Sequence, residues 1–295
     1  MQVEKLKQPT IRDRFAPDEG AAVPPAVVLE PRRGWASLGL RELWTYRELL
    51  YFLVWRDVKV RYKQTLIGAV WAVLQPVLTM IVFSLIFGRA AGLSSEGFPY
   101  PVFIYTALLP WQLFATALNQ SSMSLVTNQQ LVTKVYCPRL ILPIASTLAA
   151  LVDFGISFFV LIGLMAYYGI VPTIWVVTLP LLVALAVATA LAVGLWLAAL
   201  NARYRDIQYT IPFLTQFWFF VTPIVYSAGL LPHSLTFVYG LNPMVGVVQG
   251  FRWALLGHAT HVGPLMALAV AMVVLLLVGG LAYFRRTERL FADLV

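Results

Sequence analysis

The chain alternates between long apolar stretches and short polar ones, and this pattern predicts membrane-spanning helices. Six stretches hold roughly the 17–25 mostly apolar residues that a helix needs to cross a bilayer. They lie at about residues 65–87, 102–126, 140–168, 175–200, 211–226 and 262–283. The third contains Asp153, the single charged residue within the six. The sequence therefore predicts an all-α, polytopic membrane protein with six transmembrane helices.

A basic amphipathic segment at residues 49–63 precedes the first span. Arg56, Lys59 and Lys63 fall on one helical face. Apolar and aromatic residues recur at helical spacing on another, as Tyr51, Trp55, Val58, Tyr62 and Leu66. Such a helix is expected to lie in the membrane surface, with its apolar stripe in the headgroup boundary and its cations toward phosphates. A juxtamembrane linker whose cations only set topology is the alternative.

Two polar-flanked segments between spans also carry helix signals. Residues 229–257 are apolar nearly all round at their C-terminal end, where Asn242 and Pro243 start a helix and Gly257 stops it. Backbone at membrane depth is tolerated where protein buries it or where it lines a cavity. We therefore expect short re-entrant or gate helices in 229–257. The loop at 127–139 is expected to form a short helix closed by Pro138.

Composition and charge agree with a membrane protein. The chain is 60% hydrophobic and 12% charged, whereas soluble domains carry roughly 25% charged residues. The net charge of +8 arises from Lys and Arg between the spans, which indicates topology and not nucleic-acid binding. With the N-terminus in the cytoplasm, 19 of the 21 basic residues fall on the cytoplasmic side, all except Arg89 and Arg252. Both termini are therefore predicted to be cytoplasmic, and the Pro-rich residues 1–35 are expected to form a flexible cytoplasmic tail.

The sequence offers no energy source or catalytic centre of its own. It lacks the P-loop and dinucleotide-binding glycine patterns, and it shows no HExxH motif or Ser-His-acid set. Single Cys137 permits no internal disulfide. An intramembrane carboxylate such as Asp153 is a functional-site hypothesis by default, although hydrogen bonding to a neighbouring helix is an equal alternative. We expect a conduit that is not an enzyme and that depends on an ATP-hydrolysing partner.

Four stretches, taken in order, carry a resemblance to a known family. They are WRDVKVRYKQTLIGAVWAVLQP (55–76), LVTKVYCPRLILP (131–143), ARYRDIQ (202–208) and LNPMVGVVQGFRWALLG (241–257). The chain resembles the ABC-2 type permeases that export lipid-linked polysaccharides such as O-antigen, capsule and teichoic acid. The resemblance covers about residues 38–295, so residues 36–295 are expected to form one transmembrane domain. The tail at 1–35 is longer than the family core needs.

The resemblance implies partners and roles. Such permeases form homodimers in the bacterial inner membrane and pair with two copies of a separate subunit, which binds ATP and Mg. Segment 49–63 would lie beside the access point of a lipid-linked glycan, and 229–257 would form periplasmic gate helices. The loop 127–139 would dock on the ATPase through Lys134, Tyr136 and Arg139. An anionic headgroup would meet a cluster of cations, namely Arg56, Lys59, Arg61 and Lys63.

Aromatic rings could accept the apolar faces of sugars along a channel. The candidates are Trp71, Trp111, Phe114, Phe217, Trp218, Phe220, Tyr226 and Trp253. Interfacial anchoring and core packing are the ordinary alternatives for such residues. Three other functions stay open: an ABC-2 permease for a drug or lipid, an ion-coupled secondary transporter, and a multipass transferase. The expected contacts are membrane lipids and a lipid-linked polysaccharide, without nucleic acid and without a cofactor in this chain.

Overall fold

The computed structural model describes residues 40–63, 68–134, 137–227, 229, 236–257 and 262–288. This part of the chain is helical and contains no strand. The predicted tail at 1–35, Leu66 and Tyr136 lie outside the described residues. The helices are α1 (Leu40–Thr45), α2 (Arg47–Lys63), α3 (Gly68–Phe83), α4 (Tyr100–Thr127), α5 (Gln129–Lys134), α6 (Ile141–Tyr167), α7 (Leu179–Arg203), α8 (Ile207–Val221), α9 (Thr236–Gly240), α10 (Pro243–Leu256) and α11 (Val262–Glu288). A π-helical turn, Ser84–Ala90, continues α3, and a 3₁₀ turn, Ile174–Thr178, precedes α7.

Five helical segments among the described residues are long and apolar enough to cross a membrane. They are Val70–Ala90, Tyr100–Thr127, Ile141–Tyr167, Ile174–Arg203 and Gly263–Glu288. These correspond to five of the six predicted spans, and the all-α prediction is confirmed. The fifth predicted span, 211–226, is not confirmed, because α8 is a helix of 15 residues that ends at Val221. Thr222 is extended with ψ 132°, as expected of a residue that precedes proline, here Pro223.

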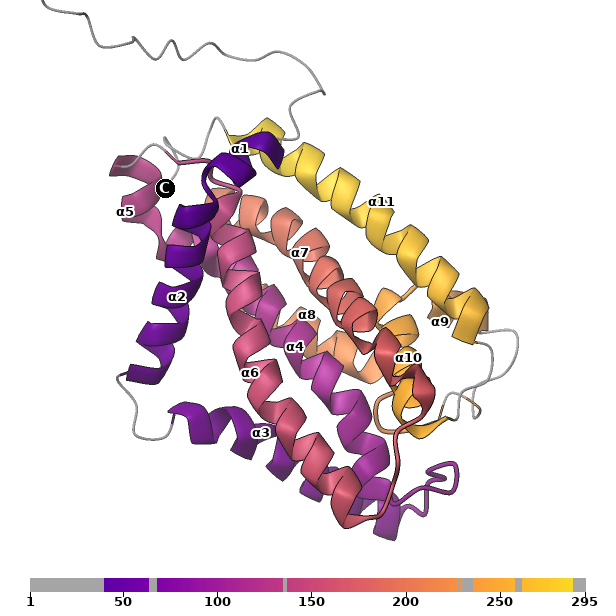
Figure 1. Cartoon of the computed structure of the whole chain (residues 1–295). Helices are drawn as coiled ribbons and strands as arrows, with labels where there is room; N and C mark the ends of the chain where they lie inside the picture. The colour runs from indigo at the N-terminus through magenta and orange to yellow at the C-terminus, as the bar shows by residue number, and fades with distance from the viewer. Residues whose placement is uncertain are drawn as a thin grey trace, which may run out of the picture. The chain divides into compact units, whose positions relative to one another are not determined.

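Helix α4 lies at the centre of the bundle, packed against α6 on one side and α7 on the other (Figure 1). Its mean hydropathy of 1.4 is the lowest of the five candidate spans, yet 78% of its most apolar window is buried. The other spans have mean hydropathies of 2.2 to 2.8 and bury at most a third of theirs. Outer helices must present apolar side chains to lipid, whereas a central helix faces protein and tolerates polar residues.

Small residues let the helices approach closely. A Cβ on Gly194 of α7 would lie 2.5 Å from the Ser121 hydroxyl of α4. On α10, Gly246 and Gly250 are four residues apart, and a Cβ on Gly246 would lie 2.7 Å from Ala269 of α11. Spacing of small residues by four positions is a common device for close helix contact in membranes. It seats the short helix α10 against the long α11 and α7.

Helix α2 runs alongside α6 from the end of the bundle that holds α1 and α5 (Figure 1). Its packed side is formed by leucines and a valine, with Leu53 only 2% exposed. Tyr51 and Trp55 of the predicted apolar stripe are exposed and point away from this packing. The helix therefore has one apolar face for the protein and another available to lipid, and its position in the membrane surface stays a prediction.

Candidate functional site

A polar groove runs between α3, α4 and α8. Its volume is about 600 Å³. About half of its lining surface is polar, and the amide and hydroxyl side chains that line it are Gln75, Thr79, Gln112, Thr116, Asn119, Gln120, Thr215 and Gln216. Three aromatic residues also line it, Phe83, Trp111 and Phe219. We call this space the groove.

The sequence of α4 explains half of this lining. Gln112, Thr116, Asn119 and Gln120 are three or four positions apart, so they share one face of the helix. Apolar residues fill the remaining faces and pack into the core. Burying amides without partners is costly, so a polar stripe on a central helix indicates a space that polar groups can enter. The spacing of these polar residues is visible in the sequence, but the prediction of channel residues considered aromatic side chains and did not include them.

A second cavity, of about 520 Å³, lies between α2, α3, α4 and α6. It shares Gln75, Gln112, Thr116 and Gln120 with the groove, so the two spaces adjoin. Its own lining adds Trp71 and the charged pair Arg61 and Asp153. We call it the side cavity. Its lining is mostly apolar, with Leu109, Leu113 and Phe154 among its residues, and it continues the groove from α8 toward α2.

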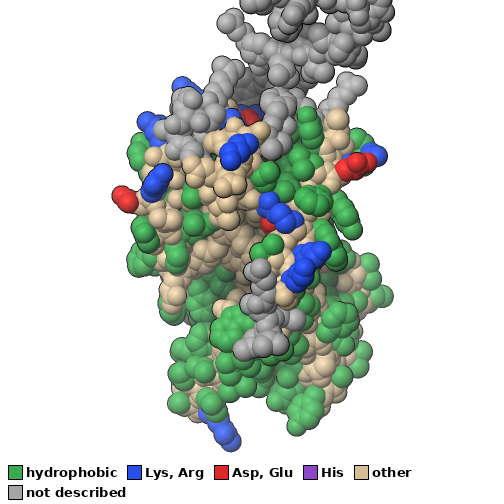
Figure 2. Space-filling view, turned by 90° about the vertical axis from the view of Figure 1, so that its left-hand side faces the viewer, with side chains coloured by type: hydrophobic (Ala, Val, Ile, Leu, Met, Phe, Trp, Pro, Cys, Tyr) green, Lys and Arg blue, Asp and Glu red, His purple; other side chains and the backbone are tan. Residues whose placement is uncertain are grey.

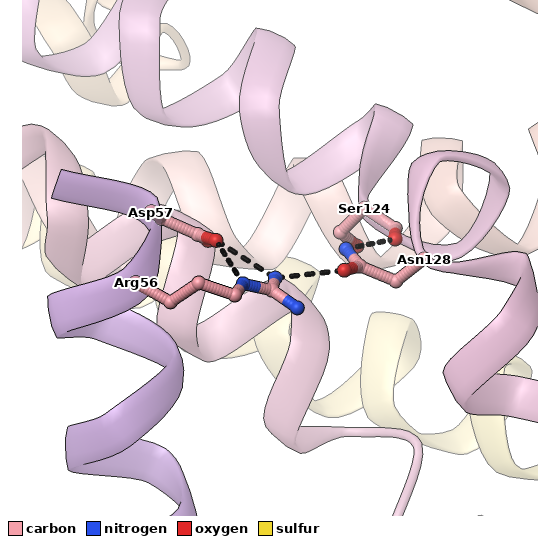
Figure 3. A network of polar contacts seen from close by, with 4 residues as sticks. All are labelled: Arg56, Asp57, Ser124 and Asn128. Carbon is pink, nitrogen blue, oxygen red and sulfur yellow. Dashed lines mark hydrogen bonds and ion pairs between the residues drawn. The ribbon is translucent and has the colours of Figure 1, made fainter. Parts of the chain in front are cut away.

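The four predicted headgroup cations of α2 divide into two kinds. Arg56 pairs with Asp57 at 2.7 Å and donates a second hydrogen bond, also 2.7 Å, to the Asn128 side chain (Figure 3). Asn128 ends α4 and donates in turn to the Ser124 carbonyl, while its own carbonyl accepts from the first turn of α5. Arg56 therefore ties α2 to the joint between α4 and α5.

Arg61 forms an ion pair with Asp153 of α6, and the Tyr62 hydroxyl donates to the same carboxylate. Burial raises the pKa of Tyr62, so its phenol stays a donor at neutral pH. Lys59 and Lys63 are exposed and form no ion pair within the described residues. Figure 2 shows Lys and Arg gathered over the upper half of the face that carries α2, above a mostly hydrophobic lower half. The two arginines of the predicted set are therefore paired with other side chains, whereas the two lysines are exposed and can contact a ligand from outside.

The eight predicted channel aromatics fall in different places. Trp71 lines the side cavity and Trp111 lines the groove. Phe114 is fully buried against Trp218, which donates to Asn242, and neither ring lines the groove or the side cavity. The others lie on the outer face of α8 or near α10, as Phe217 and Phe220 (exposed), Tyr226 (bonded to Tyr239) and Trp253 (stacked on Trp175). Their role as channel rings stays a prediction.

Arg252 of α10 is the functional-site candidate that sequence reasoning missed. It is fully buried, and its guanidinium donates to the carbonyls of Pro223 (3.0 Å), Ile224 (2.7 Å) and Tyr226 (3.3 Å). Its Cζ lies 3.8 Å from the centre of the Phe103 ring. Burial lowers its pKa to about 10, so it stays charged at neutral pH. The guanidinium supplies donors to the chain beyond α8, where helical hydrogen bonding has ended.

The predicted coupling loop forms the short helix α5, which ends at the exposed Lys134. Arg139 follows it and donates to the backbone carbonyl of Glu288, at the end of α11. Helix α5 therefore lies at the same end of the bundle as the end of α11 (Figure 1). Among the described residues, no three His, Cys, Asp or Glu side chains come together in a group that could hold a metal ion.

Comparison with known proteins gives concordant matches. A profile described as "ABC-2 type transporter" matches residues 48–256. The chain is 34% identical to the "O-antigen export system permease protein RfbA" of Myxococcus xanthus, over 86% of this chain and 98% of that protein. It is 26% identical to the protein of the same name from Klebsiella pneumoniae, over 84% and 95% of the two chains. It is also 26% identical to the "Polysialic acid transport protein KpsM" of Escherichia coli, over 81% and 93%.

Proposed function

The chain belongs to the ABC-2 type transporter family, and on that premise we propose that it is the permease subunit of an ATP-driven exporter of a lipid-linked polysaccharide. It is a multi-pass, all-α membrane protein and a transport component. Relatives named for O-antigen export and polysialic acid transport support a glycan as the cargo. The proposal places the chain in a bacterial inner membrane with both termini in the cytoplasm.

The observation that carries this proposal is the groove that α8 forms with the candidate spans α3 and α4, because amide and hydroxyl side chains line much of it. Sugars need hydrogen-bond donors and acceptors for their hydroxyls, and side-chain amides supply both. They also present apolar C–H faces, which aromatic rings such as Trp111 and Phe219 can contact. A drug or lipid exporter needs a mainly apolar path, so the amide lining favours a glycan. We retain a drug or lipid permease as the second candidate.

Two partners complete the proposal. A second copy of the chain would supply the opposite wall of the groove, because α8 exposes the aromatic rings of Phe213, Phe217 and Phe220 beside it. A separate ATP-binding subunit would dock at α5, since the chain has no nucleotide-binding motif. The hydrogen bond from Arg56 to Asn128 joins α5 to α2, so a displacement of α5 would reach the helix beside the side cavity.

Access of the substrate would begin at the exposed lysines. Lys59 and Lys63 are four residues apart on α2, so their ammonium groups share one helical face. They attract phosphate without a fixed geometry, whereas Arg56 and Arg61 are already paired. The proposal therefore narrows the predicted headgroup set from four cations to these two for first contact.

Deletion of the chain tests the function as a whole. Cells that lack it should accumulate the lipid-linked glycan on the cytoplasmic side, and the wild-type chain should restore surface glycan. Lys59→Gln with Lys63→Gln should lower export severalfold at unchanged protein level, whereas Arg89→Gln, on an exposed arginine, should not. Two results would favour the second candidate, a drug or lipid permease. One is unchanged surface glycan in the deletion strain, and the other is a deletion strain in which the wild-type chain restores resistance to a toxic drug but not surface glycan.

A further inference from the structure

The Arg61–Asp153 pair lies at the wall of the side cavity and is not sealed from it. The Arg61 side chain is 29% exposed and the Asp153 side chain 20%. Both residues line a space of about 520 Å³, which falls in the range of small-molecule sites, roughly 300–1,000 Å³. An ion pair that only fastened α2 to α6 would need no adjoining cavity. A solute in this space can reach the guanidinium.

Most of the remaining lining is apolar, but three further residues suit a sugar. Trp71 is 54% exposed, so a ring face is available. Gln112 and Gln120 face the cavity from α4, and each amide can donate and accept. Arg61, the one cation among the described residues of this lining, suits a phosphate oxygen. A phosphate joined to a sugar therefore matches the chemistry of the side cavity.

We propose that the side cavity binds the glycosyl phosphate headgroup of a polyprenyl lipid, and that Asp153 is an internal competitor for Arg61. The proposal rests on the proposed function, in which the cargo is lipid-linked. In the resting chain, Asp153 holds the guanidinium. An arriving phosphate takes its place, and Asp153 keeps the hydrogen bond from Tyr62.

Competition of this kind fits transport better than tight binding. Breaking a partly buried ion pair without a replacement leaves an uncompensated charge, which is strongly unfavourable. An exchange of one anion for another avoids that state for Arg61, which is paired before and after, while the displaced Asp153 carboxylate keeps only the hydrogen bond from Tyr62. Repulsion between the displaced carboxylate and the phosphate then favours release, when Asp153 can pair with Arg61 again. A site on a conduction path must bind well enough to admit its solute and weakly enough to let it leave.

Binding to the full-length chain in phosphatidylcholine nanodiscs tests this directly. One probe is a polyprenyl pyrophosphate that carries N-acetylglucosamine in the bilayer, and the other is inorganic pyrophosphate in solution. Asp153→Asn should tighten binding about tenfold, because the competitor loses its charge, and Arg61→Gln should weaken it by at least as much. Asp57→Asn is the matched control, since this half-buried carboxylate pairs with Arg56 and does not line the cavity.

The opposite effects expected for Asp153→Asn and Arg61→Gln on probe binding distinguish competition from an ion pair that only fastens α2 to α6. If the pair only fastens α2, both Asp153→Asn and Arg61→Gln should leave binding unchanged or lower it, and either result for Asp153→Asn overturns the proposal. Equal tightening by Asp57→Asn also overturns it, because the effect would then be one of net charge. Tightening toward both probes assigns the site to phosphate from either source, and tightening toward the lipid probe alone assigns it to the membrane-borne headgroup.

A second variant covers the case in which Asp153→Asn fails to fold. Tyr62→Phe removes the hydrogen bond that the displaced carboxylate keeps, so probe binding should weaken about threefold. Tyr51→Phe, on an exposed tyrosine of the same helix, should have no effect, and equal binding by the two variants overturns the proposal. Neither assay requires export or ATP. If the binding assays contradict the competition but the deletion strain accumulates the lipid-linked glycan, the further inference is wrong and the proposed function stands.

Discussion

Replacing Arg252 with methionine should destabilise the protein although the change removes a charge from its interior. Arg252→Met keeps a similar side-chain length but deletes the donors to the carbonyls of Pro223 and Ile224, the two shorter bonds at 3.0 and 2.7 Å. Each buried carbonyl left without a partner costs about 1–3 kcal/mol. Contact of the guanidinium with the Phe103 ring adds up to about 2 kcal/mol at a desolvated site.

An opposing effect reduces this sum. Burial of a guanidinium is unfavourable by several kcal/mol, and methionine relieves it. The two carbonyls remain in place, however, and leaving both without a donor costs about 2–6 kcal/mol together. We expect a net loss of about 3 kcal/mol in the free energy of unfolding, since relief of the charge offsets part of the lost bonding.

Thermal unfolding in detergent, followed by tryptophan fluorescence, measures the effect. A loss of this size corresponds to a fall in Tm of roughly 6–12 °C. Arg89 provides the matched control, because it is the other basic residue outside the segments predicted to be cytoplasmic and it is exposed. Arg89→Met should shift Tm by less than about 2 °C. If Arg252→Met melts within about 2 °C of Arg89→Met, the guanidinium does not support the backbone beyond α8 and the reasoning is wrong.

Three further predictions concern coupling, packing and the groove. Asn128→Ala removes the acceptor that holds α2 to the joint between α4 and α5, so export per ATP hydrolysed should fall severalfold in a reconstituted transporter, whereas Arg89→Ala, on an exposed arginine outside α5, should match wild type. Gly246→Val inserts atoms where a Cβ already lies 2.7 Å from α11 and should cost about 2 kcal/mol or more. Gly155→Ala on α6 meets nothing within 4 Å and should leave Tm unchanged or raise it. Gln112→Leu should lower glycan export at normal protein level, since its amide faces both the groove and the side cavity; unaltered export would exclude this path for the glycan.

The spans were predictable because crossing a bilayer is a local requirement. Length and hydropathy of a continuous segment decide it, and five of the six predicted spans are present as long helices. The exception, α8, shows the limit of that rule. Pro223 ends it after 15 residues, and the proline was visible in the sequence. Its consequence depends on Arg252, which lies 29 residues away from Pro223 and donates to the backbone carbonyls of the chain that follows the helix.

The candidate site was predicted in part. Basic residues on α2, a short helix at 129–134 and the carboxylate in the third span all follow from residue type and spacing. The polar stripe of α4 was equally available from its spacing, but only the packing of α4 between α6 and α7 makes it the wall of a cavity. The aromatic residues were the weakest prediction, because a ring in a membrane protein packs in the core, faces lipid or lines a groove with the same local sequence.

The sequence by itself determined an all-helical membrane protein and contained four stretches that resemble an exporter permease. The position of its basic residues on one side of the membrane stays a prediction. Only the tertiary structure decided which cations are available. Arg56 meets Asn128 across 72 residues of sequence, and Arg61 meets Asp153 across 92. Lys59 and Lys63, on the same helix, meet no such partner among the described residues. Helical propensity and hydropathy act over a few turns, whereas an ion pair depends on how two helices pack, so residues alike in sequence acquire different roles.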